Sequence, residues 1–153
     1  MSKAESQRLS LQTVEQLTQT FPEIESLHFP IEEQSHQMLM VKMKKEHQKQ
    51  GFTLIEQIRH FLIDKMCVKF IVVCDGDVDI TDWNDIVWAI TTRMDPARDT
   101  LMLNDEFGST MGLDATNKLA QEVTREWGNP IVKDPKLVEK IDHIWERLDI
   151  LPS

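Results

Sequence analysis

Three aspartates alternate with other residues directly after a β-branched run of the sequence. The run ends at Asp75, and Asp77 and Asp79 follow at every second position. Carboxylate oxygens bind hard cations such as Ca²⁺ and Mg²⁺, so one interpretation is a cation site. The calcium loop of an EF-hand does not fit, because its glycine position falls on Ile80 and its bidentate glutamate position on Ile86. Short acidic turns between a strand and a helix favour the other interpretation, a structural loop with capping carboxylates.

The other residues that could do chemistry lack the spacing typical of a site. The five histidines form no HExxH or HxH pair, and Cys67 and Cys74 lack the CxxC spacing. No GxSxG, P-loop or GxGxxG motif occurs. The motifs therefore identify no nucleophile, phosphate-binding loop or zinc site, and both thiols are expected to be buried.

Helical and strand patterns alternate along the chain and predict the elements that position these residues. The patterns predict helices at 10–21, 53–62, 81–90 and 135–148, and strands at 24–30, 35–43, 69–74 and 100–103. Residues 104–133 are the least regular stretch. We therefore expect an α/β fold, namely a three-layer α/β/α sandwich with a mainly parallel or mixed sheet. Residues 1–9 are expected to be a flexible N-terminus and residues 10–153 a single domain.

Two of the predicted helices carry specific start signals. Thr53 and Glu56 fit a capping box, in which each side chain binds a backbone amide at the helix start. Asp82 is expected to cap the next helix, whose inner face is expected to consist of Trp83, Ile86, Val87 and Ile90. Packing in the core or at a subunit interface is the role expected for the helical tryptophans.

The composition disfavours several classes of protein. The chain has 153 residues and a net charge of 17 − 26 = −9. This balance disfavours general nucleic-acid binding, because phosphate contacts need an excess of lysine and arginine. The longest nearly apolar run, residues 70–74, is far shorter than the ~20 residues of a membrane-spanning helix. The polar N-terminus does not fit a signal peptide, and two cysteines make no disulfide framework, so we expect a cytoplasmic protein.

Four segments carry a more specific resemblance. They are residues 69–75, 82–90, 92–99 and 111–118, the last followed by 125–131. In this order they resemble the C-terminal domain of the UbiD family, which comprises 4-hydroxy-3-polyprenylbenzoate decarboxylase and its aromatic-acid and acrylic-acid relatives. The resemblance runs from about residue 10 to about residue 150, and it implies the fold of that domain.

The resemblance implies part of an enzyme rather than a whole one. UbiD-type enzymes carry out a reversible decarboxylation with prenylated FMN and a divalent metal. Their N-terminal and central regions bind these two groups and also contain the catalytic glutamates and arginine. The chain resembles only the C-terminal domain, so no catalytic, cofactor-binding or metal-binding residue is assigned here. Two departures concern the loops. Only residues 104–107 lie between the predicted strand and Gly108, where relatives carry a longer loop, and residues 119–121 stand in place of Trp-Pro-Gly.

The residues that we single out lie near the carboxyl ends of the central strands, where α/β sheets usually open a crevice. They are Asp75, Asp77, Arg93, Asp95, Arg98, Asp99, Asp114, Asn117 and Lys118. Arg93, Asp95 and Arg98 are expected to form a buried ion-pair set that fixes a loop. This assigns the group a structural or partner-facing role rather than a catalytic one.

Three functions are open at this point. The first is a free-standing, non-catalytic UbiD C-terminal-like domain that forms homo-oligomers or binds a decarboxylase. The second is one subunit of a split carboxy-lyase, dependent on prenylated FMN, which a flavin-domain polypeptide completes. Its substrate would be an aromatic or unsaturated carboxylic acid. The third is a degenerate remnant. The length of the chain suits one domain but not a complete UbiD-type enzyme, which favours the first.

Overall fold

Five strands form one mixed sheet within the residues that the computed structural model describes, which are 3–30, 37–119, 122 and 134–147. The strands are β1 (Ile24–His28), β2 (Met38–Met43), β3 (Phe70–Asp75), β4 (Thr100–Asp105) and β5 (Gly108–Asp114), in the order β1-β2-β3-β5-β4. The inner strands β2, β3 and β5 are parallel, while β1 and β4 pair antiparallel at the two edges. The prediction of a mainly parallel or mixed sheet is confirmed.

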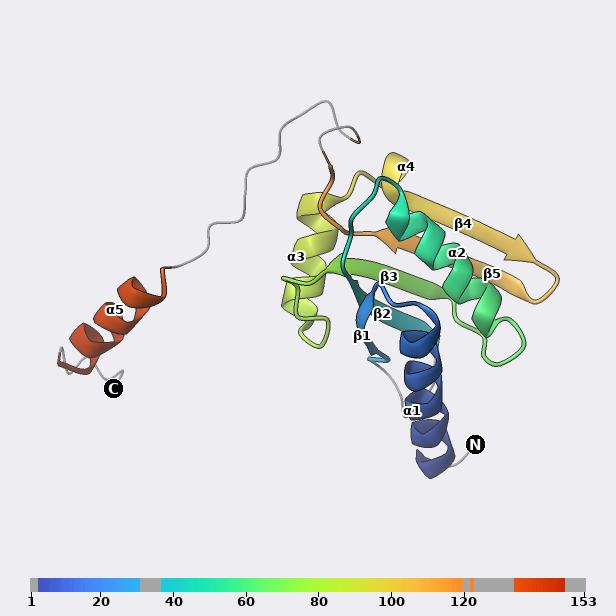
Figure 1. Cartoon of the computed structure of the whole chain (residues 1–153), viewed down its shortest axis with the longest axis horizontal. Helices are drawn as coiled ribbons and strands as arrows, with labels where there is room; N and C mark the ends of the chain where they lie inside the picture. Colours follow the sequence, from blue (N-terminus) through green and yellow to red (C-terminus); the bar gives the residue numbers. More distant parts are fainter. Residues whose placement is uncertain (1–2, 31–36, 120–121, 123–133, 148–153) are drawn as a thin grey trace.

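Helices lie on both faces of this sheet, which makes the predicted three layers (Figure 1). The helices are α1 (Lys3–Thr20), α2 (Gln50–Leu62), α3 (Trp83–Arg93), the short α4 (Pro96–Asp99) and α5 (Pro135–Arg147). The run 71–74 in β3 is buried throughout, because successive side chains of a strand point to opposite faces and both faces are covered here.

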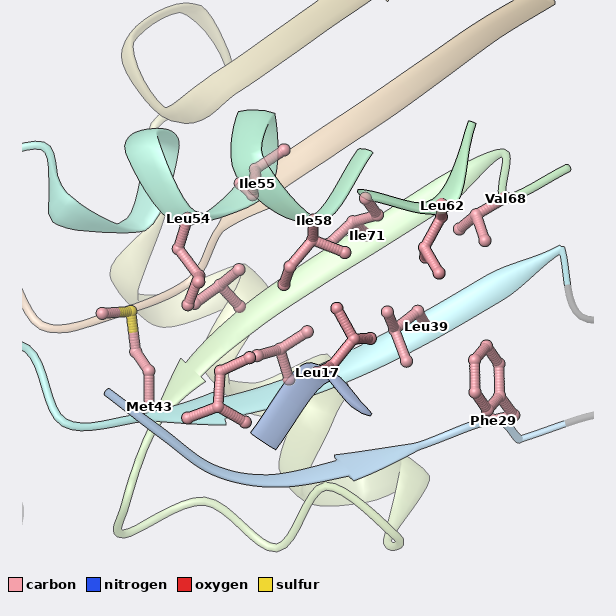
Figure 2. Packing of buried hydrophobic residues seen from close by; sticks show 13 residues of the cluster. Leu17, Phe29, Leu39, Met43, Leu54, Ile55, Ile58, Leu62, Val68 and Ile71 are labelled. Carbon is pink, nitrogen blue, oxygen red and sulfur yellow. The ribbon is translucent and has the colours of Figure 1, made fainter. Parts of the chain in front are cut away.

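The larger core lies between the sheet and the helices α1 and α2. Leu17 of α1 and Leu54 and Ile58 of α2 pack with Leu39 and Ile71 of the sheet, and all five are fully buried. Figure 2 shows these side chains converging between the helices and the strands. On the opposite face, α3 supplies a smaller core.

That smaller core joins α3 to β2 and β3. Ile86 and Ala89 pack with Met40, Val72 and Cys74. Burial raises the pKa of the Cys74 thiol to about 12, so this thiol stays protonated at neutral pH. Cys67, in contrast, is exposed, and the prediction that both thiols are buried is wrong for it.

Two predicted helix starts are wrong. The first helix begins at Lys3 rather than Ser10, so residues 3–9 belong to α1. These residues include good helix formers but lie ahead of the apolar pattern on which the prediction rested. The second helix begins at Gln50, with Lys49 at the N-cap in the left-handed conformation (φ 56°). The Thr53 hydroxyl donates back to the Lys49 carbonyl instead of forming a capping box.

The capping aspartate of α3 is confirmed, and the predicted inner face is confirmed at Ile86 and Ile90, which pack in the core below α3, but it is wrong at Trp83 and Val87. Asp82 accepts a hydrogen bond from the Asn84 amide at 2.8 Å. Trp83 and Val87 are 48% and 51% exposed. The helix is rotated so that Arg93 is buried together with Ile86 and Ala89.

The strand β5 was not predicted, because it lies in the stretch that the sequence marks as least regular. Residues 35 and 36 of the second predicted strand, residue 148 of the last predicted helix and the segment 125–131 lie outside the described residues.

Candidate functional site

The nine residues singled out in the sequence lie at or next to the carboxyl ends of β3 and β5. Asp75 and Asp114 are the last residues of these two parallel strands, which pair along their length. Arg93 ends α3, α4 carries Arg98 and Asp99, and Lys118 follows β5. The ends of neighbouring parallel strands meet at one edge of a sheet, which places these side chains together.

Lys118 binds two buried carboxylates at once. Its ammonium Nζ lies 3.2 Å from Oδ1 of Asp114 and 3.4 Å from Oδ1 of Asp99, and it donates to the Asp114 carbonyl at 2.7 Å. The Lys118 side chain is only 1% exposed. Asp114 also accepts hydrogen bonds from the amide and hydroxyl of Thr116. These contacts hold the loop 114–118 against the sheet.

Arg93 holds a second pair of carboxylates at the end of β3. Its guanidinium lies 3.3 Å from Oδ2 of Asp75 and 2.6 Å from Oδ2 of Asp77, and it stacks on the Trp88 ring with 4.7 Å to the centroid. The hydrogen bonds from Arg93 lower the pKa of Asp77. Burial raises the pKa of Asp75, although the Asn117 amide donates to this carboxylate. Asp75 therefore links the Arg93 group to the loop that Lys118 holds.

The expected trio of Arg93, Asp95 and Arg98 is split between separate contacts. Asp95 is exposed and caps α4, where it accepts from the Ala97 and Arg98 amides. Arg98 instead binds Asp99 with two hydrogen bonds of 2.8 and 2.6 Å. Burial opposes ionisation of Asp99, but its hydrogen bonds with Arg98 and the Asp95 amide outweigh burial and lower its pKa. The expected ion-pair set of these three residues therefore does not form, and both arginines pair with other aspartates instead.

Asp79, the third aspartate of the acidic turn, serves as a turn and capping residue. Its Oδ1 accepts hydrogen bonds from the Thr81 amide at 2.9 Å and from the Thr81 hydroxyl at 2.7 Å. These bonds lower the pKa of Asp79. The structural interpretation of this turn thus has a direct geometric basis.

Two site residues, Lys45 and Glu122, were missed in the sequence. Their ion pair spans 2.7 Å, and the Lys45 side chain is only 2% exposed. Lys45 also donates to the Asn117 carbonyl, while Glu122 accepts from the Lys49 and Leu119 amides at 2.8 Å each. No motif could have identified them, because Lys45 sits among other charged residues and pairs with a residue 77 positions away.

A pocket of about 180 Å³ opens beside these ion pairs. It is lined by Gln48, Lys49, Phe52, Arg98, Asp99, Asp114 and Glu122. Gly51 leaves room for the Asp114 carboxylate at the start of α2, since a Cβ at Gly51 would lie 2.6 Å from it. Four of the lining side chains, those of Arg98, Asp99, Asp114 and Glu122, thus already take part in ion pairs.

The described donor set does not fit a divalent metal. Among the residues that the structure describes, no group of three or more His, Cys, Asp or Glu side chains is placed to hold an ion. The nearby carboxylates of Asp75, Asp99 and Asp114 each face a lysine or arginine. We therefore derive no metal-dependent or flavin-dependent step from these residues.

Within the described part of the chain, no helix is long and apolar enough to cross a membrane.

Comparison with known proteins gives a family match and several structural likenesses. The model of the 3-octaprenyl-4-hydroxybenzoate carboxy-lyase C-terminal domain matches residues 6–122. The chain is similar to an evolved dimeric form of the UbiD-class enzyme HmfF from Pelotomaculum thermopropionicum, solved in complex with prFMN. The identity is 25% and the TM-score 0.59, over 82% of this chain and 28% of that one.

Two further likenesses concern the fold alone. Vanillic acid decarboxylase of Sedimentibacter hydroxybenzoicus, in closed form, has a TM-score of 0.75 at 17% identity over 90% of this chain and 31% of that one. The apo 3,4-dihydroxybenzoic acid decarboxylase of Enterobacter cloacae has a TM-score of 0.62 at 17% identity, over 86% and 32%. In each case, the match takes in less than a third of the larger protein.

Proposed function

Because the chain belongs to the family of the 3-octaprenyl-4-hydroxybenzoate carboxy-lyase C-terminal domain, we propose that it acts as a non-catalytic domain that self-associates or binds a decarboxylase. One observation carries the proposal. The buried charged side chains of the candidate site pair with one another and hold a loop, whereas large apolar side chains lie on the outside. The exposed ones include Phe70, Trp83, Val87, Trp88, Met102 and Phe107. Contiguous exposed apolar surface is typical of interaction sites.

The ion pairs argue for a structural role of the site. A general acid or base must reach its substrate with a group that exchanges protons there. Asp99 and Asp114 share the ammonium of Lys118, and Asp75 is held by Arg93 and the Asn117 amide. These contacts place the loop 114–118 and the end of β3 in one rigid arrangement, which suits a surface that must present a fixed shape to another chain.

A split decarboxylase is the second candidate, and a specific observation favours it. The decarboxylase of Sedimentibacter hydroxybenzoicus is ShVdcCD, and one of its structures, in open form, holds a truncated ShVdcD. In the second candidate, our chain would be one subunit of a carboxy-lyase that a flavin-binding polypeptide completes. That polypeptide would supply the flavin and metal, and this chain would supply the rigid edge at Asp75 and Asp114.

Light scattering coupled to size exclusion tests the first candidate, with the full chain run alone and with a UbiD-type flavin-domain polypeptide. We expect an assembled state in at least one of the two runs and no flavin absorbance from the chain alone. Decarboxylation that appears only in the mixture would favour the split enzyme.

We also propose that residues 10–153, together with the rest of α1, act as one domain. The place of action that we propose is the cytoplasm.

A further inference from the structure

The pocket beside the ion pairs lies where three elements meet. Figure 1 shows the start of α2, the short α4 and the carboxyl end of β5 at the same end of the sheet. Phe52 lies in the first turn of α2, Arg98 in α4, and Asp114 at the end of β5. The volume of about 180 Å³ is below the ~300–1,000 Å³ of sites that take drug-sized molecules. The pocket therefore suits a ligand of only a few non-hydrogen atoms.

The charged side chains in and behind the pocket wall have one positive charge in excess. Two lysines lie behind the wall, with side chains 2% and 1% exposed, and pair with its carboxylates. Together with the charged residues of the lining, they give a formal charge of 4 − 3 = +1. The count takes Lys45, Lys49, Arg98 and Lys118 against Asp99, Asp114 and Glu122. The whole chain carries −9, so the pocket differs in sign from the rest of the molecule.

Two of these carboxylates are held in the charged form. Burial opposes the ionisation of Glu122, but hydrogen bonds from Lys45 and from the Lys49 and Leu119 amides outweigh burial and lower its pKa. The pKa of Asp99 is lowered as well, although burial opposes this. Both groups are therefore ionised at neutral pH, and each already has a cation of its own.

Two cationic residues of the lining keep hydrogen-bond donors to spare. Arg98 uses Nε and Nη2 for Asp99, and its Nη1 donates to no acceptor among the described residues. Lys49 binds Glu122 through its backbone amide only, and its ammonium pairs with no carboxylate in the described part of the chain. A guanidinium and an ammonium at one pocket are the donors that bind oxyanions in proteins.

The other walls of the pocket decide which oxyanion fits. Asp99, Asp114 and Glu122 repel a second negative charge on the ligand, because like charges a few ångströms apart interact strongly near a protein surface. Phe52 is half-buried and offers an apolar surface. A singly charged group with a short hydrocarbon body satisfies both walls, which describes a small monocarboxylate.

We infer that the pocket binds one small monocarboxylate, which accepts hydrogen bonds from Nη1 of Arg98 and the ammonium of Lys49 and rests its hydrocarbon body on Phe52. The positive N-terminal end of α2 adds to the attraction. This inference goes beyond the proposed function, which gives the chain no ligand. The ligand is held and not converted, because the carboxylates of the wall are already bound to cations of the chain.

NMR titrations of the isotope-labelled full chain test this site. The protein receives sodium butyrate or sodium acetate, with sodium chloride added to keep the ionic strength constant. We expect saturating shifts of the Lys49 and Phe52 amides, while amides at the other end of the sheet stay unchanged. Butyrate should bind more tightly than acetate, by up to about fourfold for each additional methylene group that is buried on Phe52.

A charge-removing variant and its matched control locate the ligand. Lys49→Gln removes the ammonium and breaks no ion pair among the described residues. Lys49 is exposed, so the fold tolerates the change, and the amide spectrum itself checks this. We expect the dissociation constant of butyrate to rise about tenfold. Lys44→Gln removes the same charge outside the pocket, where 72% of the side chain is exposed, and should leave the affinity unchanged.

Three results would overturn the site. They are shifts that grow without saturating, a Lys49→Gln variant that binds butyrate as well as the wild type, and methylammonium chloride that binds as tightly as butyrate. Inorganic phosphate that binds more tightly than both carboxylates would overturn the choice of a monocarboxylate. A chain that assembles with itself or with a flavin-domain polypeptide, but shows no saturating shifts, contradicts this site alone and leaves the proposed function standing.

Discussion

Lys118 is the residue on which the loop after β5 depends most. It is almost fully buried and is the shared partner of Asp99 and Asp114. Its loss would leave two buried carboxylates with one cation fewer. An uncompensated buried charge costs far more than an exposed ion pair contributes.

We therefore predict that Lys118→Met destabilises the chain by about 3–5 kcal/mol, as for other buried pairs that lose one partner. Urea unfolding followed by circular dichroism measures the change. Lys44→Met is the matched control, because Lys44 pairs with Glu46 at the surface with 72% of its side chain exposed. The control should stay within about 0.5 kcal/mol of the wild type. Equal losses for the two variants would contradict the role of Lys118.

The lowered pKa of Asp99 makes part of the stability depend on pH. The folded state favours the ionised carboxylate, so the unfolded chain takes up its proton at higher pH than the folded one. The contribution is present above the ordinary pKa of an aspartate, about 4, and is lost as pH falls through the lower folded value. Asp99→Asn should thus lose most stability at pH 7 and progressively less below pH ~4. A constant difference across unfolding curves from pH 3 to 7 would rule this out.

At the level of elements, the sequence predicts those helices and strands that have a local hydrophobic period or a capping residue of their own. The strands β2 and β3 and the cap at Asp82 follow from apolar runs and a single capping residue. The strand β5 does not, because Gly108 and Gly112 interrupt its pattern and glycines weaken a strand assignment. The rotation of α3 is likewise not encoded locally. Trp83 and Val87 fit an inner face by period alone, but the helix turns so that Arg93 reaches the carboxylates of β3.

Gly112 allows α2 to pack closely on β5, because it has no side chain. A Cβ there would lie 2.4 Å from Cγ2 of Ile55 on α2, so the glycine allows the helix to approach β5. Gly112→Ala should destabilise the fold by about 1–3 kcal/mol through overpacking. In an Ile55→Ala background, the same change should cost much less, because the added methyl group enters the space that the isoleucine leaves. A double-mutant cycle with additive costs would contradict this close packing.

At the scale of the whole molecule, the sequence predicts which residues gather but not how they pair. The nine singled-out residues meet because strand ends in a parallel sheet share one edge. Which carboxylate meets which cation depends on helix rotation and on contacts distant in sequence, such as Lys45 with Glu122. These features leave a rigid, internally paired edge at one end of the sheet and open apolar surface at the other.

The mass of the full chain in solution, measured by light scattering with absorbance recorded at flavin wavelengths, tests the central claim most directly. We predict twice the mass of a single chain, or a complex when a UbiD-type flavin-domain polypeptide is added, with no flavin eluting with the chain alone. A single-chain mass in both runs, or a flavin that elutes with the isolated chain, would contradict it.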